Sequence, residues 1–299
     1  MPTTRTPLLA LLALALAPAA ASADAPATNT DMRFVSVGAQ ADARHNQLAL
    51  STLSLPVGQH AWVQAGVGQS RSAAAAGGQR PAIVTGAVGV ASQSVQLTVN
   101  ASQRSDAARY RQTDLGASLD WRRDGGNVGL DVTHRRSRTS GTVATANGLG
   151  GTTTVAALAQ VLGTGVGVHG GLQVSEHLSV YAAAARNHYR STTHQAGTTP
   201  SGGLLARALL GSVSAVDRDE AVLDRTAQVG TTYRWSKVAV SAEYLTGQVH
   251  DNGGALHSAD LKAAIDVAPG WRVTPGVGRG TSDQGGQATF ASLSATYGW

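Results

Sequence analysis

The 299-residue chain contains no cysteine, which excludes disulfide bonds, thiolate metal sites and a lipid anchor attached to cysteine. Aromatic residues make up only 4% of the chain, with two Phe, and charged residues only 14%. The net charge of +5 is modest, and the arginines are scattered rather than gathered in one basic patch, which counts against a nucleic-acid partner. No repeat of about 20 to 50 residues is visible, which counts against solenoids and propellers.

The N-terminus has the pattern of a cleaved signal peptide. Arg5 is followed by an apolar run from Leu8 to Ala17, and Ala21-Ser22-Ala23 fits a cleavage site with small residues. The apolar core of about ten residues is too short for the roughly 20 that a membrane-spanning helix needs. We therefore predict a signal peptide over 1–23 and a short segment, 24–30, ahead of the first folded element. The rest of the chain has no apolar run of spanning length, and the mean hydropathy is −0.06, which excludes a helical membrane protein.

Apolar and polar residues alternate through most of the remaining chain. In 113–122, for example, Leu115, Leu119 and Trp121 share one parity, and Asp114 and Asp120 share the other. Alternation with a period of two predicts strands that are apolar on one face only. Fourteen segments of strand length can be marked: 32–41, 47–55, 60–71, 82–90, 95–104, 113–122, 127–137, 164–174, 178–189, 225–235, 238–249, 258–268, 271–280 and 288–299.

The last of these segments ends on an aromatic residue. Leu293, Ala295, Tyr297 and Trp299 share its apolar parity. A C-terminal strand of this kind resembles those of bacterial outer-membrane β-barrel proteins. The resemblance is to this porin-like class, not to one named family. It implies that the barrel-assembly machinery reads the C-terminal strand, and that the partners are outer-membrane lipid and lipopolysaccharide.

Sequence and resemblance together predict an all-β fold: a transmembrane antiparallel up-and-down β-barrel over 31–299, in a Gram-negative outer membrane. We expect about 14 strands, with 12–16 possible, and 24–30 as a short periplasmic segment. The links alternate between tight turns and longer loops, as they do in such barrels, where the turns are periplasmic. A secreted β-sandwich would also alternate, but its apolar face would be richer in Phe, Leu and Ile. No nucleic acid and no cofactor is expected.

Aromatic residues cluster close to the predicted tight turns. Tryptophan and tyrosine favour the membrane interface, where the ring is partly apolar and its polar edge stays wet. Trp62 shares its face with Gln64 and Gly66, so its parity allows an inward orientation. The predicted interface aromatics are Trp121, Tyr233, Trp235, Trp271, Tyr297 and Trp299.

The parity opposite to the apolar one would face the barrel interior. Charges are costly in lipid, so strand-borne charges point inward whatever the function, and their structural role is to be solvated or mutually paired. The functional alternative is a selectivity ring in a water-filled pore, for which balanced signs predict weak ion selectivity. The candidate pore-lining residues are Arg104, Asp114, Asp120, Arg122, Asp131, Arg135, Arg234, Glu243, Asp260, Lys262, Asp266 and Arg272.

Two predicted long links, Arg138 to Leu162 and Arg190 to Asp224, contain apolar runs. The run Gly203–Leu210 has three interpretations: a short helix that constricts the pore, two further strands that make sixteen, or a surface that contacts lipopolysaccharide. We favour constriction. The run Val155–Leu162 is open to the same interpretations.

Catalytic patterns are absent from the sequence. Outer-membrane phospholipases and deacylases resemble one another in a His two residues before a nucleophilic Ser, but Tyr189-Arg190-Ser191 follows His188, and Ser258 follows His257 directly. The acidic cluster Asp217, Asp219 and Glu220 is typical of a solvated loop. The nine histidines, including His134 and His169, lack the spacing of metal ligands. We expect no enzymatic activity.

The predicted function is a water-filled, weakly selective channel for small hydrophilic solutes or oligosaccharides. Two alternatives are an export or surface-assembly barrel for a polysaccharide, and a closed barrel that acts structurally or through its loops, as an adhesin or a lipid-binding protein. The alternation specifies a barrel far better than it specifies a substrate.

Overall fold

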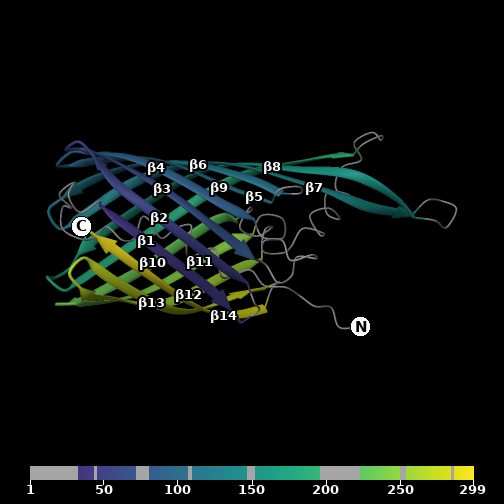
Figure 1. The fold of residues 1–299 in the computed structure, drawn as a ribbon. Helices are drawn as coiled ribbons and strands as arrows, with labels where there is room; N and C mark the ends of the chain where they lie inside the picture. Colours follow the sequence, from purple (N-terminus) through teal and green to yellow (C-terminus); the bar gives the residue numbers. More distant parts are fainter. Residues whose placement is uncertain are drawn as a thin grey trace.

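The chain folds into one closed β-barrel in the computed structural model, which describes residues 33–43, 46–71, 81–106, 110–146, 152–195, 223–249, 254–283 and 286–299 (Figure 1). None of these ranges contains a helix long and apolar enough to cross a membrane. The strands are β1 (Phe34–Asp42), β2 (Gln47–Val57), β3 (Ala61–Arg71), β4 (Ala82–Ala91), β5 (Val95–Asp106), β6 (Tyr110–Arg123), β7 (Gly126–Ala146), β8 (Thr152–Gln173), β9 (Leu178–Gln195), β10 (Leu223–Trp235), β11 (Val238–Val249), β12 (Ala255–Ala268), β13 (Trp271–Ser282) and β14 (Gly286–Gly298).

Each strand pairs antiparallel with its neighbours in the sequence, and β1 pairs with β14 to close the ring. The closing register runs from Phe34 opposite Gly298 to Asp42 opposite Phe290. Closure gives every strand a partner on both sides, so the barrel has no edge strand, which removes the main hazard of an exposed sheet. The prediction of an all-β, up-and-down barrel with 14 strands is confirmed.

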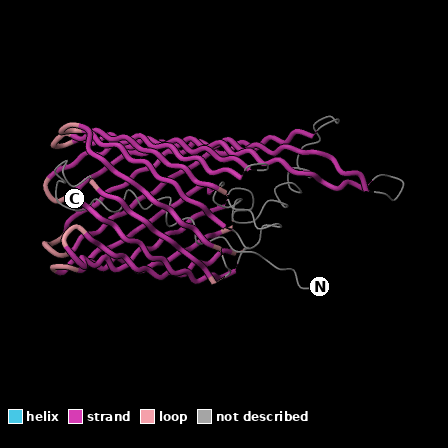
Figure 2. The backbone as a smooth tube through the Cα atoms, in the orientation of Figure 1, coloured by secondary structure: helices cyan, strands magenta, loops and turns pink. Residues whose placement is uncertain are grey.

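The two ends of the barrel differ in their connections. Short connections, of two to four residues, follow β2, β4, β6, β8, β10 and β12. All of them lie at the end of the barrel that also holds the C-terminus (Figure 2). Three of these turns use a glycine at positive φ: Gly58 at 68°, Gly125 at 80° and Gly270 at 75°. Glycine adopts this region without strain, as the Asp124-Gly125 and Pro269-Gly270 turns require. We call this end the turn end and the opposite one the loop end.

The two faces of the wall differ in chemistry. Large apolar side chains that are exposed to the surroundings share the parity that the sequence marks as apolar, and include Val67 at 62% exposed, Val132 at 58% and Val166 at 64%. Side chains of the opposite parity are mostly buried or half-buried, because they crowd together inside the ring. We call these the outward face and the interior face.

Three strands are longer than the alternation predicts. The segment from Arg138 to Leu162, predicted to be mostly loop, is strand up to Ala146 and again from Thr152, so that prediction is wrong. The run Val155–Leu162 is part of β8, where it pairs with β7. Residues such as Thr139, Ser140 and Thr142 do not alternate in hydropathy, yet their backbones pair, and threonine favours strands. The run Gly203–Leu210 lies outside the described residues.

Candidate functional site

Contacts between strands that are not neighbours identify the face that points into the barrel. His169 on β8 reaches Asp120 on β6, and Tyr181 on β9 reaches Glu243 on β11. Strands two apart are separated by roughly 9.5 Å, so their side chains can meet only on the concave side of the wall, where they converge. The polar parity is therefore the interior face, and it forms the candidate site.

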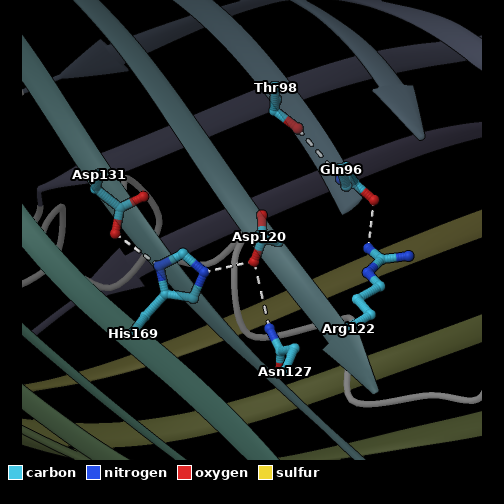
Figure 3. A network of polar contacts seen from close by, with 7 residues as sticks. All are labelled: Gln96, Thr98, Asp120, Arg122, Asn127, Asp131 and His169. Atoms are coloured by element: carbon cyan, nitrogen blue, oxygen red, sulfur yellow. Dashed lines mark hydrogen bonds and ion pairs between the residues drawn. The ribbon is translucent and has the colours of Figure 1, made fainter. Parts of the chain in front are cut away.

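One interior network centres on His169 (Figure 3). Its Nε2 lies 2.7 Å from Asp120 Oδ1, and its Nδ1 lies 2.7 Å from Asp131 Oδ2. Asp120 also accepts a hydrogen bond of 3.3 Å from Asn127 Nδ2. Ionised carboxylates only accept hydrogen bonds, so between two of them an imidazolium, with a donor on each nitrogen, satisfies both. The network joins three strands, β6, β7 and β8.

A glycine makes this reach possible. Gly129 on β7 stands in register between Asp120 and His169, and a Cβ there would lie 2.3 Å from His169 Nε2 and 2.9 Å from Asp120 Oδ1. The imidazole thus occupies the space of the missing side chain. Gly230 plays the same part between Tyr181 and Glu243: the phenol lies over it and donates its hydrogen bond to the carboxylate.

The same arrangement of an aromatic ring over an interior glycine of the adjacent strand recurs around the barrel. Such rings shield the exposed glycine backbone, which stabilises strands that are rich in glycine. The further pairs are Trp62 over Gly89, Tyr189 over Gly163, and Phe290 over Gly278.

A second network surrounds Asp114 on β6. Its Oδ1 accepts a hydrogen bond of 2.5 Å from Arg135 Nε, and its Oδ2 accepts one of 2.7 Å from Gln112 Nε2 and one of 3.4 Å from Ser102 Oγ. Tyr110 in turn donates to Gln112. The aspartate and arginine side chains are 29% and 26% exposed, so this ion pair is shielded more than a surface pair would be.

The structure places all twelve predicted pore-lining residues on strands β5–β7 and β10–β13. Lys262 pairs with Asp260 at 2.7 Å, and Arg272 pairs with Asp266 at 2.7 Å. Arg122 donates to Gln96, whose amide donates to Thr98 (Figure 3). Arg104 and Arg234, on β5 and β10, have partners of their own. That these side chains line an open pore stays a prediction.

The interior wall is uneven around the ring. The described parts of β1–β4 and β14 carry small or uncharged interior residues such as Ser36, Thr52, Thr85 and Ser294, and their one interior carboxylate, Asp42, lies at the loop end. Asp42 is held there by Asn46, with hydrogen bonds of 2.9 and 2.7 Å. The interior charged residues and His169 thus lie on β5–β8 and β10–β13, whereas β14 and β1–β4 form a largely neutral arc.

Near the loop end the buried interior side chains are both apolar and polar, and the polar ones include Gln40, Asn46, Gln112, Ser137 and Ser258. The buried apolar side chains of the described residues gather there, close to the loop-side ends of their strands, and we call them the apolar collar. Its members come from β2, β4, β6, β8–β12 and β14: Leu48, Ile83, Tyr110, Val161, Tyr189, Leu223, Leu245, Leu256, Ala288 and Phe290.

The predicted interface aromatics lie at the turn end. Trp121, Tyr233, Trp235, Trp271 and Trp299 are exposed, with 39–53% of each side chain accessible, and Tyr297 is half-buried between two of them. Ring centroids are 4.6 Å apart for Tyr233 and Trp235, 4.9 Å for Trp271 and Tyr297, and 5.9 Å for Tyr297 and Trp299. These rings form a band on the outward face.

Sequence reasoning missed the roles of His169 and Tyr181. Each of these side chains contacts a carboxylate two strands away. The only sign of this contact in the sequence is an interior glycine on the strand between them, and that glycine can be matched to its neighbours only once the strand register is known. No group of three or more His, Cys, Asp or Glu that could hold a metal ion occurs in the described part of the chain.

No protein-family model matches the sequence. No curated protein matches it either. A solved Pseudomonas aeruginosa FadL homologue is similar, with a TM-score of 0.62 and 12% identity over 90% of this chain and 90% of that one. The CymD monoaromatic hydrocarbon channel is similar with a TM-score of 0.57 and 9% identity, over 96% of this chain and 92% of that one. At these identities the similarity concerns the fold: the chain has the fold of outer-membrane β-barrel channels.

Proposed function

We propose that the protein is a channel of a Gram-negative outer membrane, and that small hydrophilic solutes or oligosaccharides pass through its interior. The observation that carries this proposal is the opposite chemistry of the two faces. The outward face exposes valine, leucine and an aromatic band, as a lipid-facing wall requires, whereas the interior face carries charged and polar networks. A polar interior suits water and hydrophilic solutes.

Weak ion selectivity is part of the proposal. The twelve interior residues comprise six acids and six bases, and contacts such as Asp114–Arg135 and Asp260–Lys262 neutralise them locally. Selective channels use rings of one sign instead. Because the carboxylates are engaged by basic groups or by Tyr181, we also propose that the protein is not an enzyme.

Single-channel conductance of the mature protein, refolded into a planar phospholipid bilayer, tests this proposal. The absence of native cysteine makes every introduced thiol unique, which allows a matched pair on β5. Thr98→Cys lies on the interior face, and Val99→Cys lies on the outward face, where Val99 is 45% exposed.

A water-soluble, charged thiol reagent should lower the conductance of the Thr98→Cys channel and leave the Val99→Cys channel unchanged. Steady openings with this difference support passage through the interior. A barrel that is folded but silent contradicts the channel proposal and favours binding through the loops.

A further inference from the structure

Exposed arginines cluster on the outward face near the loop end. They lie on β6, β7, β9 and β10, and we call them the arginine patch: Arg111, Arg136, Arg138, Arg186, Arg190 and Arg225. These arginines share the outward face with the exposed apolar residues. On β7, for example, successive outward positions are Val128, Leu130, Val132, His134, Arg136 and Arg138. The patch therefore borders the apolar outer surface directly.

The strand register sets arginines of the patch face to face. Arg111 stands opposite Arg138 on the β6–β7 pair, and Arg186 stands opposite Arg225 on the β9–β10 pair. Side chains directly opposite on antiparallel strands are about 5 Å apart at Cβ, and like charges in these positions destabilise the sheet. A bound anion between the two guanidinium groups would remove this cost.

The described parts of the protein supply no such anion. The outward face of β6 to β9 carries no aspartate or glutamate, and no arginine of the patch forms an ion pair with a described carboxylate. Asp224, which precedes Arg225, is half-buried beside a β-bulge and has interactions of its own. Arg111 donates a hydrogen bond of 2.9 Å to the neutral Gln103. Among the described residues, the patch therefore has no carboxylate that neutralises it.

The position and chemistry of the patch indicate which anion would bind there. Guanidinium groups bind phosphate oxygens in pairs of parallel hydrogen bonds, and long arginine stems lie along apolar surface while the charged head reaches the interface. Tryptophan marks the turn end of the outward face, whereas the loop end has arginine. We propose that the arginine patch binds the phosphate groups of lipopolysaccharide, the phosphorylated glycolipid of the outer leaflet. This inference rests on the proposed location in an outer membrane.

A matched pair of quadruple variants tests it. The patch variant carries Arg111→Gln, Arg138→Gln, Arg186→Gln and Arg225→Gln, which removes both facing pairs. The control variant carries Arg33→Gln, Arg71→Gln, Arg123→Gln and Arg279→Gln, four exposed arginines outside the patch. Both are refolded into neutral detergent micelles and titrated with lipopolysaccharide, with the same glycolipid after enzymatic removal of its phosphates, and with inorganic phosphate. Binding and thermal unfolding are measured for each.

The unmodified protein and the control variant should bind intact lipopolysaccharide with similar affinity, and the patch variant at least about tenfold more weakly. Dephosphorylation should weaken binding to the unmodified protein by a similar factor. Without lipopolysaccharide the patch variant should unfold at the same or a higher temperature, because the facing charges are gone. With it, only the unmodified and control proteins should gain thermal stability.

Equal binding by the two variants, or equal binding of the dephosphorylated glycolipid, overturns the inference. An equal thermal shift from inorganic phosphate at the same phosphate concentration overturns it too, because the surface would then recognise the free ion. Conductance in bilayers made only of phospholipid keeps the two proposals apart. A channel that conducts there without binding lipopolysaccharide refutes the arginine patch alone, and a folded barrel that binds but is silent refutes the channel alone.

Discussion

The imidazole of His169 lies directly over Gly129, so a Cβ on residue 129 would be 2.3 Å from Nε2. The ring cannot easily move aside, because Asp120 and Asp131 hold both of its nitrogens. We therefore expect Gly129→Ala to destabilise the barrel by about 1–3 kcal/mol, the usual cost of overpacking. Urea-induced unfolding of the refolded protein in micelles, followed by tryptophan fluorescence, measures the change in the free energy of unfolding.

The control for this substitution is Gly38→Ala. Gly38 also faces the interior, but a Cβ there would meet its nearest atom, Cβ of Ser294, at an ordinary contact distance of 3.4 Å. In an H169A background the cost of Gly129→Ala should largely disappear, since the clash is with that ring. A cost that persists without the imidazole would mean that the strand itself requires glycine at this position.

A second prediction concerns ion selectivity and the Asp260–Lys262 pair. The aspartate side chain is 5% exposed and the lysine 30%, so Asp260→Asn leaves a cation with little screening in the interior. The reversal potential of the channel in a potassium chloride gradient should shift toward anion selectivity. Asp266→Asn is the comparison, because both partners of its pair with Arg272 are about half exposed, and water and salt screen the remaining charge. Equal shifts for the two variants would contradict a role of burial.

The fourteen strands could be predicted because lipid demands alternation. Segments such as 95–104 and 113–122 have an apolar residue at nearly every outward position, and the structure extends them by only a few residues as β5 and β6. Beyond the apolar zone this constraint ends. The continuation of β7 to Ala146 does not alternate between apolar and polar residues, so nothing in its pattern separates a strand from a loop.

The partners of the interior charges could not be predicted for a different reason. Alternation places Asp120 and Glu243 on the interior face, but which residues meet depends on the register of three successive strands. The rows Asp120–Gly129–His169 and Glu243–Gly230–Tyr181 exist only once that register is set. The position of a charged residue along its strand therefore predicts that it faces the interior, whereas its partner depends on how the neighbouring strands are aligned.

A third prediction tests the assembly signal that the resemblance implies. Trp299 and Trp235 are both 53% exposed at the turn end, and each ring lies beside a tyrosine, Tyr297 and Tyr233 respectively. As interface anchors they are equivalent, so Trp299→Ala and Trp235→Ala should refold equally well in detergent. In cells, Trp299→Ala alone should lower the amount of folded barrel in the outer membrane, judged by heat-modifiable migration on gels. Equal losses for both variants would show that only interface anchoring matters.

The last prediction concerns the tip of the β7–β8 hairpin, which extends past the rest of the barrel rim (Figure 1). Pairing of β6 with β7 ends at Thr139, and pairing of β8 with β9 begins at Ala157. The rows from Thr142 opposite Ala156 to Ala146 opposite Thr152 therefore pair only β7 with β8. A two-stranded ribbon is only marginally stable in water and contributes nothing to ring closure. Replacing Val143–Val155 by Asn-Gly joins Thr142 and Ala156, which already face each other, through a favoured two-residue turn.

The shortened protein should refold with an unchanged midpoint of thermal unfolding and an unchanged conductance. A longer replacement, of Arg136–Leu162 by Asn-Gly, joins the facing residues Arg135 and Gly163 and serves as the control. It removes rows that also pair with β6 and β9, so it should lower the midpoint. If the shorter replacement is as damaging as the longer one, the hairpin tip belongs to the cooperative unit of the barrel, and pairing alone does not define that unit.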